Sequence, residues 1–171
     1  MNYYSGADLA RSFRLVRKNT LQLAHDIPLA QFDYRATPDT RSISETLVHI
    51  AGNPLWQQKL HAARATSLSF EDYGNYMKDV QAFTSTLTDR DAILEALEKG
   101  GETFGTFLES LSDSTLGERV QFAPGSDPLT KTRFEMLLGV KEHEMHHRGQ
   151  LMVLQRLIGI VPHLTRARMA R

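Results

Sequence analysis

Residues 132–158 read TRFEMLLGVKEHEMHHRGQLMVLQRLI, and their pattern predicts a long amphipathic helix. It opens with Thr132-Arg-Phe-Glu135, a capping box in which the threonine hydroxyl and the glutamate carboxylate satisfy free backbone N–H groups at a helix start. Apolar side chains then recur every three or four residues until Gly159 and Pro162 end the helix near Ile158. One face therefore forms an apolar seam with two histidines in its middle. The seam consists of Met136, Val140, His143, His147, Leu151, Leu154 and Ile158.

The rest of the chain shows the same helical spacing of apolar residues. A second capping box, Ser42-Ile-Ser-Glu45, opens a helix that continues past Leu60, with a kink expected before Pro54. The sequence has no convincing strand alternation, and a short extended piece is expected only at Val120 to Phe122. Long helices joined by modest loops predict an all-α four-helix bundle. The other predicted helices run from Gly6 to Asp26, from Glu71 to Thr86 (a shorter one) and from Asp89 to Leu111.

Composition narrows the class of protein. The 171 residues suggest one domain, residues 1–171, and 20 Lys+Arg balance 20 Asp+Glu, which argues against a nucleic-acid partner. The chain has no cysteine, so disulfides, thiol nucleophiles and cysteine-ligated metals are excluded. No apolar run approaches the length of a membrane span, and the first residues lack the pattern of a signal peptide. We therefore expect a cytoplasmic protein without a membrane partner.

The histidines of the last long helix carry the functional signal. His143 and His147 are four residues apart and leave the same helical face, which suits two ligands of one divalent metal. Residues 143–147, His-Glu-Met-His-His, also match H-E-x-x-H, the zinc-peptidase motif in which Glu144 would be the general base. Such peptidases commonly take a third ligand downstream, but no acidic residue follows Glu144, and Val153 stands where a third histidine is expected.

The third ligand is therefore expected upstream. His49 is the best candidate, because it lies near the centre of one face of the second long helix. If the second and last long helices are neighbours, it completes a three-histidine site with open coordination positions, which is typical of a catalytic metal. Of the other histidines, we expect His146 to lie beside the site or at the surface. We expect three to face solvent: His25, His61 and His163.

Two strings resemble one known family. Leu47-Val-His-Ile-Ala51, followed far downstream by His143-x-x-x-His147-Arg-Gly-Gln-Leu151, is similar to the DinB family of metal-dependent enzymes, and the connection from Ile27 to Ser42 also looks like that family. The resemblance implies a DinB-like four-helix bundle with a long crossover connection, a homodimer, and one divalent metal held by His49, His143 and His147. Characterised members of this superfamily include thiol-dependent transferases and isomerases that use low-molecular-weight thiols such as bacillithiol or mycothiol, and many members have no assigned reaction.

These observations predict a metal-dependent enzyme that acts on a small-molecule substrate. A divalent ion (Zn, Ni, Fe or Mn) would bind and deprotonate a thiol, for S-transfer to a small electrophile, or water, for hydrolysis. One alternative is a non-catalytic, dimeric stress-response or metal-binding protein. Another is a hydrolase of the H-E-x-x-H type that uses Glu144.

Overall fold

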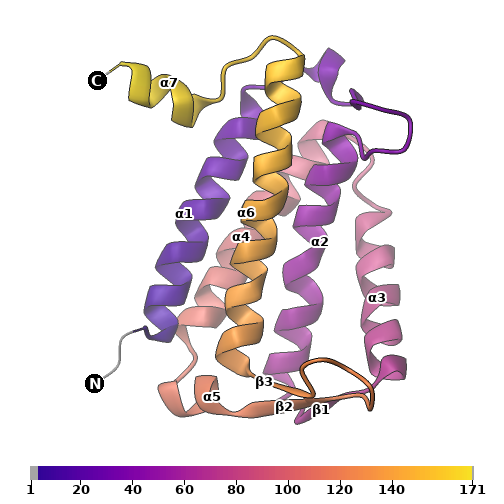
Figure 1. The fold of residues 1–171 in the computed structure, drawn as a ribbon, viewed down its shortest axis with the longest axis vertical. Helices are drawn as coiled ribbons and strands as arrows, with labels where there is room; N and C mark the ends of the chain where they lie inside the picture. The colour runs from indigo at the N-terminus through magenta and orange to yellow at the C-terminus, as the bar shows by residue number, and fades with distance from the viewer. Residues whose placement is uncertain (1–3, 171) are drawn as a thin grey trace.

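Four long helices pack side by side and form a bundle (Figure 1). The computed structural model describes residues 4–170. Each of α1 and α2 packs against both α4 and α6, so the two consecutive helices lie diagonally across the bundle. This architecture confirms the predicted all-α bundle. The four helices are α1 (Gly6–His25), α2 (Ile43–Ala62), α4 (Arg90–Glu109) and α6 (Arg133–Leu157).

The helix starts follow from the capping residues. Ser42 accepts a hydrogen bond from the backbone N–H of Glu45, and the Glu45 carboxylate accepts one from the N–H of Ser42. Thr132 and Glu135 make the same reciprocal pair at the start of α6. Both capping boxes were predicted from the sequence and are confirmed. α2 continues through Pro54 without ending there.

The connection between α2 and α4 is a long crossover. It contains α3 (Phe70–Thr84), which packs against α2 at the edge of the bundle and has no fully buried residue (Figure 1). The other helical pieces are short: η1 (Leu29–Gln31), α5 (Asp113–Gly117) and α7 (His163–Met169). Within residues 4–170, no helix has the length and apolar character needed to cross a membrane.

A small sheet closes one end of the bundle. The expectation of a single extended piece at Val120–Phe122 was incomplete, because three strands pair in the order β1-β2-β3. β1 runs parallel to β2, and β3 runs antiparallel to it. Two of the strands are too short for alternation to reveal them in the sequence. The strands are β1 (Ser67–Leu68), β2 (Arg119–Phe122) and β3 (Thr130–Thr132).

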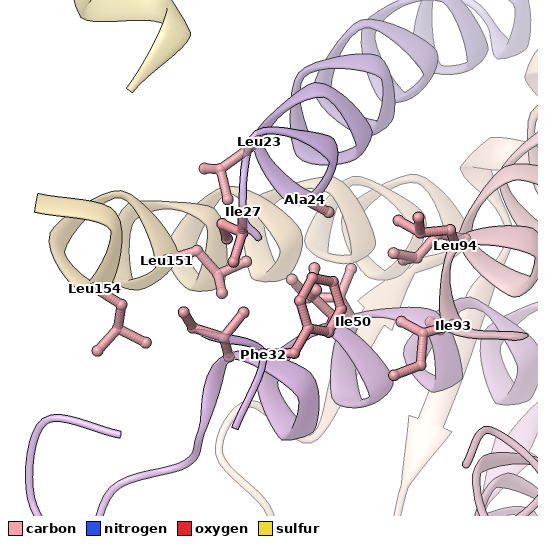
Figure 2. Close-up of a cluster of buried hydrophobic side chains, with 13 residues drawn as sticks. Leu23, Ala24, Ile27, Phe32, Ile50, Ile93, Leu94, Leu151 and Leu154 are labelled. Carbon is pink, nitrogen blue, oxygen red and sulfur yellow. The ribbon is translucent and has the colours of Figure 1, made fainter. Parts of the chain in front are cut away.

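A large apolar cluster fills the bundle near the connection between α1 and α2 (Figure 2). All four long helices contribute to it, and Phe32 of the connection packs into the same cluster. Ile50 is 1% exposed and Leu151 is fully buried. Because these side chains are close-packed in the core, they fix how α2 and α6 are rotated about their own axes. Of the candidate metal ligands, His49 directly precedes Ile50, and His147 lies one helical turn before Leu151.

His61 does not face solvent as expected, because its side chain is fully buried. Its Nδ1 accepts a hydrogen bond from Arg133 at 3.0 Å, and its Nε2–H donates to the Gln57 side-chain oxygen at 3.0 Å. The buried Arg133 also binds Glu118 and the carbonyl of Ala65. His61 therefore belongs to a polar network that joins α2 and α6 to the residues just before β1 and β2.

The other two histidines expected at the surface differ from each other. His25 is exposed, in agreement with the expectation. His163 is only partly exposed, and its Nε2–H donates to Asn19 Oδ1 at 3.2 Å. This contact ties the start of α7 to α1.

We predict that His61 makes the fold acid-sensitive. Burial and the neighbouring Arg133 cation lower the His61 pKa to about 4 from 6.5. The unfolded chain therefore takes up this proton first, and stability falls as the pH drops from about 6.5 to about 4, by on the order of 3 kcal/mol. Urea unfolding across this pH range should show that the free energy of unfolding falls less with decreasing pH in His61→Gln than in the wild type. The exposed-site control His25→Gln should keep the wild-type slope, and equal slopes in all three proteins would contradict the assignment.

Candidate metal centre

Three histidines from two neighbouring helices converge on one point. α2 and α6 pack side by side, as the ribbon shows (Figure 1), and His143 and His147 lie one turn apart on α6, where their candidate ligand atoms meet His49 of α2. His49 of α2 completes the group, and the candidate ligand atoms of all three lie within 4.8 Å of one another. The structure thus brings together the three residues singled out from the sequence.

The spacing of the ring nitrogens fits a metal ion. His143 Nε2 lies 2.9 Å from His49 Nε2 and 3.2 Å from His147 Nε2. Metal–imidazole bonds of about 2.1 Å place two nitrogens about 3.0 Å apart at a right angle and about 3.4 Å apart at a tetrahedral angle. The observed distances correspond to ligands in adjacent positions around one ion, and the cluster is fit to hold a divalent cation.

Gln150 fixes the orientation of one ligand ring. The Nδ1–H of His147 donates to Gln150 Oε1 at 2.7 Å, which leaves the lone pair of Nε2 facing the cluster. The amide N–H of Gln150 then donates to His146 Nε2 at 3.2 Å. A hydrogen-bonded outer nitrogen is the usual support of a metal-ligating histidine. His146 lies at the surface beside the site, as expected.

The environment keeps the three rings neutral. Burial lowers the pKa of His49 to about 4, and the charge of Arg41 contributes to the same shift. The pKa of His143 also falls to about 4, through burial and the neighbouring His147. Burial lowers the pKa of His147, although its bond to Gln150 opposes the shift. Neutral imidazoles offer lone pairs at neutral pH, which is the state that binds a metal.

Glu144 is not placed as the general base of the H-E-x-x-H motif would be. Its side chain is 2% exposed, so it is not a solvated surface charge. Both carboxylate oxygens are bound by Arg17 of α1, at 2.9 Å from Nε to Oε1 and 2.8 Å from Nη2 to Oε2. A carboxylate that is bound by Arg17 of α1 in this way does not fit a general base acting at the histidine cluster. The interpretation of Glu144 as the base of an H-E-x-x-H motif is therefore corrected, because this glutamate has a structural role.

The Arg17–Glu144 pair orients α6. Arg17 also donates to the carbonyl of Leu97 at 2.6 Å, so the pair links α1, α4 and α6. Gly101 makes room for it, since a Cβ there would lie 2.8 Å from Arg17 Cγ. The ion pair fixes the rotation of α6 where it packs against α1, and thereby directs its histidines. The sequence contained a sign that Arg17 is buried, because it follows Phe13 by four residues and so lies on the same buried face of α1.

Comparisons with known proteins agree with this fold. A family model described as the DinB superfamily matches residues 12–151. Among solved structures, the chain is similar to a DinB-like protein, YjoA, from Bacillus subtilis. The two share 22% sequence identity with a TM-score of 0.66, over 89% of this chain and 92% of that chain. No curated protein matches the chain.

Proposed function

Because the chain belongs to the DinB superfamily, we propose that it is a metal-dependent enzyme whose divalent ion is held by His49, His143 and His147. The observation that carries this proposal is the convergence of three imidazole nitrogens, with His143 Nε2 2.9 Å and 3.2 Å from the other two. Three protein ligands leave coordination positions open, which is typical of catalytic and not of structural sites. Imidazole ligands suit Zn²⁺, Ni²⁺, Fe²⁺ and Mn²⁺ alike.

The reaction proposed is transfer of a small thiol to an electrophile. A bound divalent ion supplies a Lewis acid that lowers the pKa of a thiol or water at neutral pH. In the transfer, the sulfur forms a bond to the electrophilic carbon, the leaving group departs with its electron pair, and the thiol proton passes to solvent. Hydrolysis would follow the same course with water as the nucleophile.

The residues of the chain would each have a defined part. The two α6 histidines and His49 would bind the ion as neutral ligands, and Gln150 would hold the His147 ring in the tautomer that presents Nε2. The half-buried position of the cluster at the junction of α2 and α6 leaves it within reach of small molecules. The homodimer expected from the sequence remains part of this proposal.

A turnover assay tests the proposal. Metal-free protein is reloaded separately with each of the four metals and incubated with low-molecular-weight thiols and an activated aryl halide whose thioether product absorbs light. We expect metal-dependent product formation that falls to the uncatalysed rate in His147→Ala, because a ligand is lost. His25→Ala, which removes an exposed histidine outside the cluster, should keep full activity.

Two results would contradict the catalytic proposal. Unchanged turnover in His147→Ala would mean that the reaction does not use the cluster. Metal uptake without turnover on any thiol or ester of a broad panel would favour the non-catalytic metal-binding alternative. Peptide cleavage lost on substitution of Glu144 is not expected, because its carboxylate is bound to Arg17.

A further inference from the structure

A cavity of about 370 Å³ lies beside the histidine cluster. Its walls come from the connection before α2, from the first turn of α2 and from α6. Gln150, which binds His147, is part of the lining, so the cavity and the cluster share a wall. Ala36, Val153 and Leu154 give the cavity an apolar side. A volume of this size accommodates a small molecule.

Arg41 is the charged group of this cavity. It is exposed and forms no hydrogen bond or ion pair with another residue of the described range 4–170. It lines the same cavity as Gln150, whose side chain binds His147, so the cavity places this cation on the side of the cluster. An unpaired guanidinium carries a rigid fork of N–H donors that matches a carboxylate or a phosphate.

The segment that carries Arg41 is held in place by a different arginine. Arg35 donates to the carbonyl of Thr40 at 2.8 Å and to Glu45 Oε1 at 2.7 Å. The residue after Arg41 is Ser42, whose side chain and backbone are fixed in the capping box of α2. Arg41 is therefore presented from an ordered backbone, which lowers the entropic cost of binding a ligand.

A cation at this place opposes a second cation in the cluster unless an anion lies between or beside them. Resting on the function proposed above, we propose that the cavity binds an anionic small molecule, with its carboxylate or phosphate on Arg41 and its body along the apolar side. The substrate or thiol cosubstrate of the enzyme thus belongs to the class of small molecules that carry an anionic group. Arg41 would be the residue that selects this class.

Titrations followed by NMR test the assignment on the full chain, both metal-free and zinc-loaded. The probes are succinate, inorganic phosphate and the neutral analogue succinamide. We expect saturable shifts of the Arg41 Nε–H and Gln150 side-chain signals with succinate, phosphate or both, and none with succinamide. Whichever anion binds more tightly identifies the anionic group.

Charge-matched variants complete the test. Arg41→Gln should weaken anion binding at least about tenfold, because a charge-assisted hydrogen bond is lost. Lys18→Gln removes one exposed positive charge on α1 and should bind the anion as the wild type does. Equal affinity in Arg41→Gln, equal binding of succinamide, or no saturable binding would overturn the proposal.

Zinc uptake separates this inference from the function on which it rests. Arg41→Gln should still bind zinc, because it keeps all three histidines. Zinc binding together with unchanged anion affinity in this variant would refute the role of Arg41 alone. A wild-type protein that takes up no zinc would instead refute the proposed metal site.

Discussion

Replacing Glu144 by Gln is expected to lower the free energy of unfolding by about 3–5 kcal/mol, because it leaves the Arg17 cation buried without its counter-ion. Arg17 and Glu144 are 4% and 2% exposed, so water cannot replace the lost carboxylate. The loss is a large part of the roughly 5–15 kcal/mol typical of a folded domain. Thermal unfolding followed by circular dichroism should show a drop in Tm on the order of 10 °C.

Two further variants make this result specific. Glu142→Gln alters an exposed carboxylate two residues away on α6 and should leave Tm unchanged within a degree or so. The double variant Arg17→Met/Glu144→Met removes both charges and should recover much of the lost stability. A Glu144→Gln protein of wild-type stability that has lost a metal-dependent peptidase activity would contradict the structural role of this ion pair.

The second large effect is expected at the cluster itself. His143→Ala should lower metal affinity more than about a hundredfold, since even residues that only support a ligand contribute ten- to hundredfold. His143 is the most informative position because its Nε2 lies next to those of both other histidines. Competition with a chromogenic chelator measures the affinity. His25→Ala should bind the metal as the wild type does, whereas wild-type affinity in His143→Ala would contradict the three-histidine site.

Much of the fold follows from local signals in the sequence. The capping boxes at Ser42 and Thr132 set the starts of α2 and α6, because backbone N–H groups need partners at those points. Apolar spacing placed the ends of the four long helices within a few residues. β1 and β3 were missed because pairing with β2, and not their own residues, makes them strands.

The candidate site shows where such reasoning stops. His143 and His147 follow from helical spacing, but His49 needed α2 and α6 to be neighbours, which only the tertiary fold decides. Glu144 was misassigned although it follows Val140 by four residues and precedes Leu151 by seven, on the same buried face. Its partner is 127 residues away on α1, beyond any local pattern. The role proposed for Arg41 could not be predicted from the sequence, because this residue lies in an irregular connection whose packing sets its position.

Anomalous diffraction from crystals of the zinc-loaded protein would locate the metal. We expect one strong zinc peak at about 2.0–2.2 Å from the Nε2 atoms of His49, His143 and His147. A peak bound by fewer than these three imidazoles, or zinc bound elsewhere on the chain with the cluster free of metal, would contradict the three-histidine site.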